Sequence, residues 1–392
     1  MKYDSEYIYF PFLIKYAVVE GNSLWFMDIA NIGLCHADIT DNKIKSIYKI
    51  PETQLFEENK YYGLKIVNNK LILLPYCSGS VLIFHINEEK FSEIDLNIQT
   101  DVQNPICKAS YVYDEMLYLF ILSVGEVVVV DLKEEKITKR ITILLDKNYQ
   151  MNDSKIQFSG MCAYIQDIKL GRMIKFDIRN QTFEQRKLLW NTSQWQLMEG
   201  EGREIYLRGD YGQIAKWEWI ADEPHILAQL PSDMKYYVKE GNTLRWELYQ
   251  KTKINKATLE KFYDDGEGIW FVPFSSVELV RIDKITHEIK KLVYADEEEQ
   301  SARNRISWGK YFLCEDDSRE FLWVYSLKRN LIYKINIREF TYEEIKLSIS
   351  KRDLNTSIRN CFVNHKWVEE SAHLGILQLI GYVQTLNGSE GD

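Results

Sequence analysis

Residues 269–292 read IWFVPFSSVELVRIDKITHEIKKL. The stretch opens with an apolar and aromatic tract, turns at a serine pair, and continues as a second tract that ends at Asp283. A charged turn then leads into the alternating segment 288–292. Apolar residues at every second position are typical of half-buried β-strands. The stretch therefore predicts strands joined by tight turns.

The same unit recurs along the chain, most clearly at residues 24–47. The residue that ends its later apolar tract recurs 42 to 64 residues apart and is mostly Asp or Asn. These positions are Asp38, His85, Asp131, Asp177, Trp219, Asp283 and Asn336. An Asp or Asn side chain accepts a hydrogen bond from the backbone two residues on and so starts a turn. The next residue is aliphatic at six of the seven positions, Lys284 being the exception.

A second recurring position lies inside the first strong strand of each unit, and five of its seven residues are aromatic. They are Trp25, Ile72, Tyr118, Ala163, Tyr206, Trp270 and Trp323. Rings repeated in this way are expected to pack one sheet on the next. Each unit has room for a further strand, for example at 61–67, 109–113, 259–263 and 306–313. Four strands at this period predict an all-β, seven-bladed β-propeller of four-stranded antiparallel blades, with six or eight blades as alternatives.

The repeat predicts a propeller over residues 1–348, with blades at about 12–50, 60–96, 107–146, 155–189, 194–228, 258–294 and 305–348. An insertion at 231–256 is expected to be a short helix or an extra hairpin. Segment 7–12 is expected either to close the last blade as an outer strand or to lead into the first. Residues 349–392 form a tail with helical spacing of apolar residues, expected to dock on the propeller or to form a dimer or partner surface.

The bulk composition is that of a folded domain, with 45% hydrophobic and 13% aromatic residues in a chain of 392. A net charge of −9 without a basic stripe argues against a nucleic-acid partner. No apolar run is long enough to span a membrane. The N-terminus lacks a basic segment followed by an apolar one, so we expect a cytoplasmic protein with six reduced cysteines.

The repeats at 24–39 and 269–283 resemble those of the broad Kelch, YVTN and streptogramin-lyase group of β-propellers. The resemblance covers roughly residues 12–348 and implies the fold alone. The Gly-Gly pair of Kelch repeats is missing, as are the Gly-His and Trp-Asp pairs of WD40 repeats. Streptogramin lyases use His and Glu with magnesium near the central opening, and no His-x-His segment matches here.

The sequence offers no catalytic signature. The six histidines are not spaced as metal ligands, so we expect neither a metal nor a cofactor. No phosphate-binding loop and no Gly-x-Ser-x-Gly motif occurs. The pairs Asp264-Asp265 and Asp316-Asp317 are expected to cap turns, and Gly200 and Gly202 to lie in a turn before a strand.

We therefore expect a non-catalytic binding or scaffolding propeller whose loops on one face recognise a protein, peptide or carbohydrate. The expected contacts are aromatic residues of blades four to six, namely Trp190, Trp195, Tyr211, Trp246 and Tyr249. Each of these rings has packing in the core as its alternative. The alternative function is a lyase or hydrolase acting on a carbohydrate or small molecule at the central opening.

Overall fold

A computed structural model describes the following parts of the chain: residues 6–9, 12, 14–28, 33–51, 61–75, 79–98, 107, 109–143, 154–192, 194–230, 235–240, 243–248, 262–271, 278–293, 311–315, 320–326 and 331–354. The fold divides into two compact units, residues 1–103 with 312–392, and residues 104–311.

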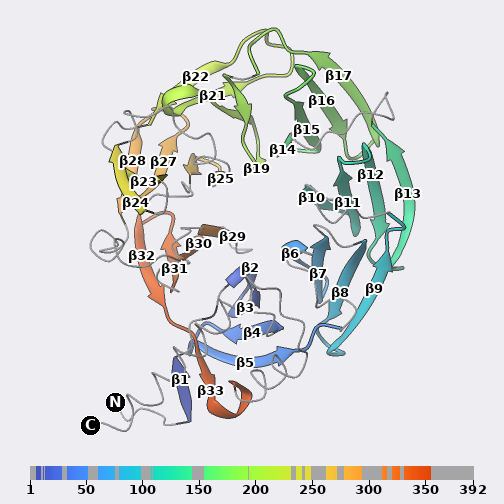
Figure 1. The fold of residues 1–392 in the computed structure, drawn as a ribbon, viewed down its shortest axis with the longest axis vertical. Helices are drawn as coiled ribbons and strands as arrows, with labels where there is room; N and C mark the ends of the chain where they lie inside the picture. The colour runs from blue at the N-terminus through green and yellow to red at the C-terminus, as the bar shows by residue number, and fades with distance from the viewer. Residues whose placement is uncertain are drawn as a thin grey trace. The chain divides into compact units, whose positions relative to one another are not determined.

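The first unit holds blades one, two and seven, of which blades two and seven are four-stranded sheets and blade one is part of a six-stranded sheet (Figure 1). Blade one consists of β2 (Ile14–Glu20), β3 (Ser23–Asp28), β4 (Leu34–Asp38) and β5 (Lys43–Tyr48). Blade two consists of β6 (Tyr61–Val67), β7 (Lys70–Pro75), β8 (Ser80–His85) and β9 (Lys90–Asp95). Blade seven consists of β29 (Tyr311–Glu315), β30 (Phe321–Ser326), β31 (Leu331–Asn336) and β32 (Thr341–Ile345).

The second unit holds blades three to six. Blade three consists of β10 (Ala109–Tyr113), β11 (Met116–Ile121), β12 (Glu126–Asp131) and β13 (Lys136–Thr142). Blade four consists of β14 (Lys155–Ser159), β15 (Cys162–Asp167), β16 (Arg172–Asp177) and β17 (Thr182–Lys187). Blade five consists of β18 (Gln196–Leu197), β20 (Ile205–Arg208), β21 (Gln213–Trp217) and β22 (His225–Gln229). Blade six consists of β25 (Phe262–Asp264), β26 (Gly268–Phe271), β27 (Glu278–Asp283) and β28 (Ile289–Val293).

The protein is thus a seven-bladed β-propeller of four-stranded antiparallel blades, which confirms the predicted fold. The recurring ring position falls on the second strand of every blade. All seven of its residues are buried, from 0% exposed at Trp270 to 3% at Trp25 and Tyr118. Five of them, all but Ile72 and Trp270, belong to apolar clusters that run between neighbouring blades, so that each blade covers a face of the next.

The turn between the third and fourth strands has the same geometry in six blades. The side chain that ends the third strand accepts backbone N–H groups two or three residues on at Asp38, Asp131, Asp177, Asp283 and Asn336. The residue four positions on has a left-handed φ of 52–59° in each case, and so does Glu89 of blade two. The backbone N–H of Glu134 is the main reason that the pKa of Asp131 lies below its ordinary value.

At two of the seven turn positions the residue is neither Asp nor Asn, and its side chain has no oxygen that could accept these backbone amides. His85 ends β8 but uses its ring, which lies 2.9 Å from the hydroxyl of Ser92 on β9. Trp219 lies two residues beyond the end of β21, so the turn of blade five begins earlier than the repeat predicted. Ile220, which the repeat predicted to be equivalent to Leu132 and Ile178, is consequently 82% exposed, whereas those two residues are buried.

The glycines at 200 and 202 form strand β19 (Gly200–Gly202), where a turn was expected. β19 pairs in parallel with β14 of blade four, although it follows β18 of blade five in sequence. A Cβ at Gly200 would lie 2.6 Å from Cε1 of Phe262, the first residue of β25. The expectation of a turn was wrong because glycine here allows two strands to pack closely, which is a role of glycine distinct from its role in turns.

The insertion contains a hairpin, β23 (Lys235–Glu240) with β24 (Thr243–Leu248), which is one of the two expected forms. The tail begins with a strand, β33 (Ser348–Ser350), and residues 351–354 are helical; residues 355–392, including the expected apolar stripe, lie outside the described residues. Segment 7–12 contributes β1 (Tyr7–Tyr9), which pairs with β33 instead of joining blade seven. No helix in the described parts of the chain is long and apolar enough to cross a membrane.

Candidate functional site

The five aromatic residues expected to bind a ligand lie in different settings. Trp190 follows β17 and is half-buried, whereas Trp195 is 7% exposed and packs against Gly209, where a Cβ would meet its ring at 2.5 Å. Tyr211 lies in the short 3-10 helix η2 (Asp210–Gly212) and Trp246 in β24, with side chains outside the described atoms. Tyr249 lies outside the described residues. Among the described side chains, the structure thus brings together Trp190 and Trp195, in one apolar cluster between blades four and five.

That cluster contains a chain of touching aromatic rings. The centroids of Trp190 and Trp217 are 5.9 Å apart, and Trp219 lies 5.9 Å from Trp217 and 6.0 Å from Tyr164 of β15. Burial raises the pKa of Tyr164 to about 12, so its phenol stays neutral. Trp217 and Tyr164 belong to the core, while Trp190 and Trp219 reach the surface on either side of them.

The connection between β21 and β22, residues 218–224, is longer than its counterpart at 132–135 in blade three and is held by several bonds. The Trp217 indole donates to the Ala221 carbonyl at 3.1 Å, and the Ala221 amide donates to the Glu218 carbonyl at 2.9 Å. Arg186 of β17 donates to the Trp219 carbonyl and, at 2.7 Å, to the Asp222 carboxylate. The loop of blade five is therefore fixed to the outer strand of blade four.

Two aliphatic side chains flank these surface tryptophans and point to solvent. Leu189 is 70% exposed and precedes Trp190, and Ile220 is 82% exposed and follows Trp219. We call Leu189, Trp190, Trp219 and Ile220 the seam patch. Scattered exposed aliphatic residues are ordinary, but each of these two adjoins a half-buried tryptophan of the apolar cluster between blades four and five, and exposed apolar groups at such a place are a candidate binding surface.

The indole nitrogen of Trp190 adds a polar feature to the seam patch. It is buried and has no hydrogen-bond acceptor among the described groups, whereas the indole of Trp217 is paired. Buried donors in folded proteins are nearly always paired with protein or ordered water. A carbonyl oxygen brought by a ligand, or a water, would satisfy this group.

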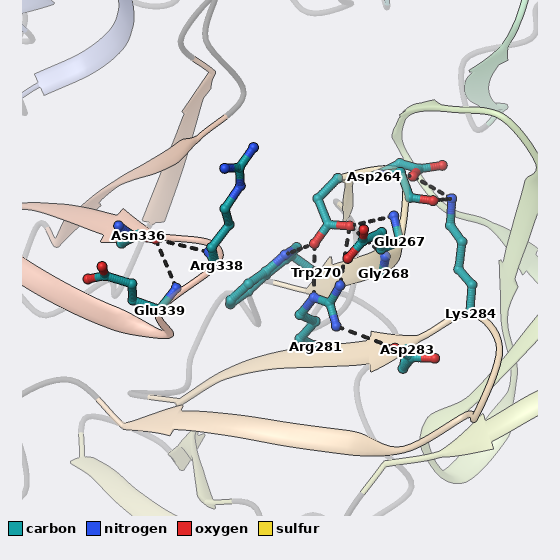
Figure 2. A network of polar contacts seen from close by, with 12 residues as sticks. Asp264, Glu267, Gly268, Trp270, Arg281, Asp283, Lys284, Asn336, Arg338 and Glu339 are labelled. Atoms are coloured by element: carbon teal, nitrogen blue, oxygen red, sulfur yellow. Dashed lines mark hydrogen bonds and ion pairs between the residues drawn. The ribbon is translucent and has the colours of Figure 1, made fainter.

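A cluster of charged side chains lies at the Asp264-Asp265 turn of blade six (Figure 2). Unlike the apolar seam patch, it is held by hydrogen bonds and ion pairs. The Asp265 carboxylate accepts the Trp270 indole at 2.7 Å, the Arg281 guanidinium at 2.9 Å and two backbone amides of its own turn. Asp264 pairs with Lys284. Burial alone would raise the pKa of Asp265, but the bonds from Arg281, the Gly268 amide and Trp270 hold it below its ordinary value. The buried carboxylates of Asp264 and Asp265 are thus each paired with a basic side chain, so the cluster stabilises the turn.

No three His, Cys, Asp or Glu side chains of the described residues are placed to hold a metal ion. Two serine–histidine contacts lie in the described residues: the Ser92 hydroxyl is 2.9 Å from Nε2 of His85, and the Ser23 hydroxyl is 3.1 Å from Nε2 of His36. Burial lowers the pKa of His36, and its ring stacks on Trp25 at 4.1 Å. Ser23 and His36 lie on the adjacent strands β3 and β4, where His36 is opposite Trp25 of the apolar cluster between blades one and two, and this placement accounts for their contact without catalysis.

Sequence reasoning named Trp190 but missed Leu189 and Ile220. The sequence contains a signal that the repeat positions did not use. Gly79, Gly125 and Gly171 each lie six residues before the turn position of their blade, and the carbonyl of each accepts the backbone amide of the residue just after the fourth strand. Gly212 follows the same rule and points to Glu218, not Trp219, as the equivalent residue. Applying this rule would have placed Ile220 in a loop.

Comparison with known proteins finds the fold but no family. No protein-family model matches the chain, and no curated protein matches it by sequence. A catalytically inactive virginiamycin B lyase from Staphylococcus aureus with quinupristin is similar in structure, with a TM-score of 0.52, 9% identity, and 83% of this chain and 93% of that one covered. The WD40 repeats of RRP9 give a TM-score of 0.51 at 11% identity, covering 82% and 91%.

PorZ, an essential bacterial surface component of the type-IX secretion system of Porphyromonas gingivalis, gives a TM-score of 0.53 at 10% identity. The match covers 87% of this chain and 39% of PorZ, so the chain corresponds to well under half of that protein. Likeness at this identity shows the fold alone. The class is therefore a β-propeller protein, similar in fold to streptogramin-lyase and WD40 propellers, and the propellers it resembles perform unrelated tasks.

Proposed function

We propose that this propeller is a non-catalytic binding module that recognises a protein through the seam patch of blades four and five. The observation that carries the proposal is the exposure of Ile220 on a loop that four hydrogen bonds and two ring contacts hold in place. A loop that is already held in place loses little backbone entropy when a partner covers it, which favours binding.

Of the ligands expected from the sequence, a protein or peptide fits this surface better than a carbohydrate. Sugars stack on open aromatic faces, but Trp195 is buried and Trp190 is half-covered. Aliphatic side chains such as Leu189 and Ile220 match apolar groups of a protein. The alternative of an enzyme at a central opening draws no support from any side-chain cluster in the described residues.

The test compares two double variants as bait in the organism that makes the protein. Leu189→Asp with Ile220→Asp removes the apolar surface, and Glu134→Ala with Asn180→Ala, on the turns of blades three and four, is the matched control. We expect proteins that the wild type and the control capture and the patch variant does not. Equal capture by the patch variant would place binding elsewhere, and capture by none of the three would exclude a stable protein partner.

The proposal includes a cytoplasmic location. Its support is that Cys162 of β15 is a free thiol. Fractionation of the native host with an antibody would test it, and recovery in the membrane or medium fraction would contradict it.

A further inference from the structure

The two ends of the described chain pair with each other at the outer edge of blade one. β1 runs antiparallel to β33, with Tyr7 opposite Ser350 and Tyr9 opposite Ser348. Figure 1 shows both strands beside β5, and the order of the resulting sheet is β1-β33-β5-β4-β3-β2. Neither strand is one of the four that make a blade. We call this pair the terminal clasp.

The terminal clasp is bonded to the turn of blade one. The backbone amide and the hydroxyl of Ser348 both donate to the Asn42 carbonyl, at 2.9 and 3.2 Å. Ser348 pairs in parallel with Lys43, whose ammonium lies 4.4 Å from the ring centroid of Tyr7. β33 follows β32 of blade seven after two residues, so the clasp links the last blade to the first.

Apolar packing joins the same parts. Ile349 and Leu354 are fully buried in a cluster that also contains Phe26 of blade one and Trp323 of blade seven. The Tyr325 hydroxyl of β30 donates to the Phe12 carbonyl at 2.6 Å within this core. The packing between blades one and seven and the packing under the terminal clasp are therefore one cluster.

We propose that the terminal clasp is a latch that holds blades one and seven together, and that releasing it opens this junction before the rest of the molecule unfolds. The four strands of blade one are consecutive in sequence, and so are those of blade seven. No chain segment runs directly from β5 of blade one to β29 of blade seven. Within each unit, every other neighbouring pair of blades is joined by a chain segment, which lowers the entropic cost of keeping the two blades in contact. Local opening of a propeller is therefore expected first where only the clasp and packing resist it.

The proposal is tested by locking the clasp reversibly in the full chain with Tyr9→Cys and Ser348→Cys. The Lys351 amide bonds to the Glu6 carbonyl, which makes 9 and 348 a pair without mutual hydrogen bonds, where side chains are closest. Hydrogen exchange is measured on the same sample, oxidised and reduced, with wild type as the control for the native thiols. We expect oxidation to slow exchange about tenfold in β2–β5 and β30–β32 and to leave β14–β16 unchanged.

A second variant opens the latch. Ile8→Asp places a charge in the partly buried clasp strand and is expected to raise exchange about tenfold in the same two blades. Ile285→Asp, at a side chain that is 90% exposed, is the matched control and is expected to change nothing. Uniform changes that include β14–β16, or no change on locking, would overturn the proposal. The locked protein decides the matter even if Ile8→Asp fails to fold.

Discussion

Individual polar side chains join the blades of this propeller where backbone pairing stops. Gln166 of β15 is fully buried, donates to the Trp195 carbonyl at 2.8 Å and accepts the Leu197 amide at 2.6 Å. Gln157 of β14, also fully buried, accepts the Tyr206 amide at 2.9 Å. Each of these glutamine side chains takes the place of a backbone hydrogen-bond partner for a strand of the next blade. It thereby satisfies backbone groups that would be costly to bury without a partner.

Asp265 connects strands β26 and β27 within blade six through Trp270 and Arg281, and its charge makes stability depend on pH. Because its pKa in the folded protein lies below the ordinary value of 3.8, its contribution is complete above that value. The contribution is lost as the pH falls from 3.8 through the folded-state pKa. Asp265→Asn removes the closer of the two carboxylates that pair with Arg281, leaving Asp283 at 3.8 Å, and is expected to lower the free energy of unfolding by about 1–3 kcal/mol at pH 7.

Urea unfolding at a series of pH values checks this prediction. The difference between wild type and Asp265→Asn is expected to shrink below pH 3.8, since the wild-type carboxylate becomes protonated there. Asp222→Asn, at a side chain that is 71% exposed, serves as the control and should show a small difference at every pH. A gap that stayed constant or widened on acidification would show that another group controls the acid response.

At the scale of elements, β19 is the strand that departs most from the repeat. It pairs with β14 of blade four, and the Glu199 carbonyl just before it accepts the Phe262 amide of blade six at 3.0 Å. One short segment of blade five therefore ties its two neighbours. Glycine is required because the backbones approach too closely for a Cβ.

Gly200→Ala is expected to destabilise the protein by about 1–3 kcal/mol, because the added carbon would lie 2.6 Å from the Phe262 ring and 2.7 Å from its carbonyl oxygen. The denaturation midpoint in urea measures the effect. Gly160→Asn is the comparison: no atom lies within 4 Å of a Cβ there, and Asn tolerates its φ of +56°. Similar losses in the two variants would mean that crowding at β19 is not the cause.

At the scale of the whole molecule, the sequence predicted what repeats and missed what does not. Blade number, strand number and the buried rings follow from periodicity, because each copy repeats the same solution to the same packing problem. β19 and the terminal clasp each lack a counterpart in the repeat, so the repeat does not predict them. Trp190 could be named from its residue type, whereas the exposure of Ile220 depends on β21 ending at Trp217, which the spacing from Gly212 to Glu218 indicates and the choice of Trp219 as the turn position obscured.

The seam patch should therefore be separable from the fold. Leu189 and Ile220 are exposed, so replacing both with Asp removes few contacts and is expected to change the free energy of unfolding by no more than about 0.5 kcal/mol for each site. The same change removes an apolar surface and is expected to reduce concentration-dependent light scattering of the purified protein, because exposed apolar patches promote association. Thermal unfolding and light scattering, measured together, check both halves. A large fall in the midpoint would mean that these side chains support the core, and the seam patch would then be part of the scaffold with no surplus apolar surface left for a partner.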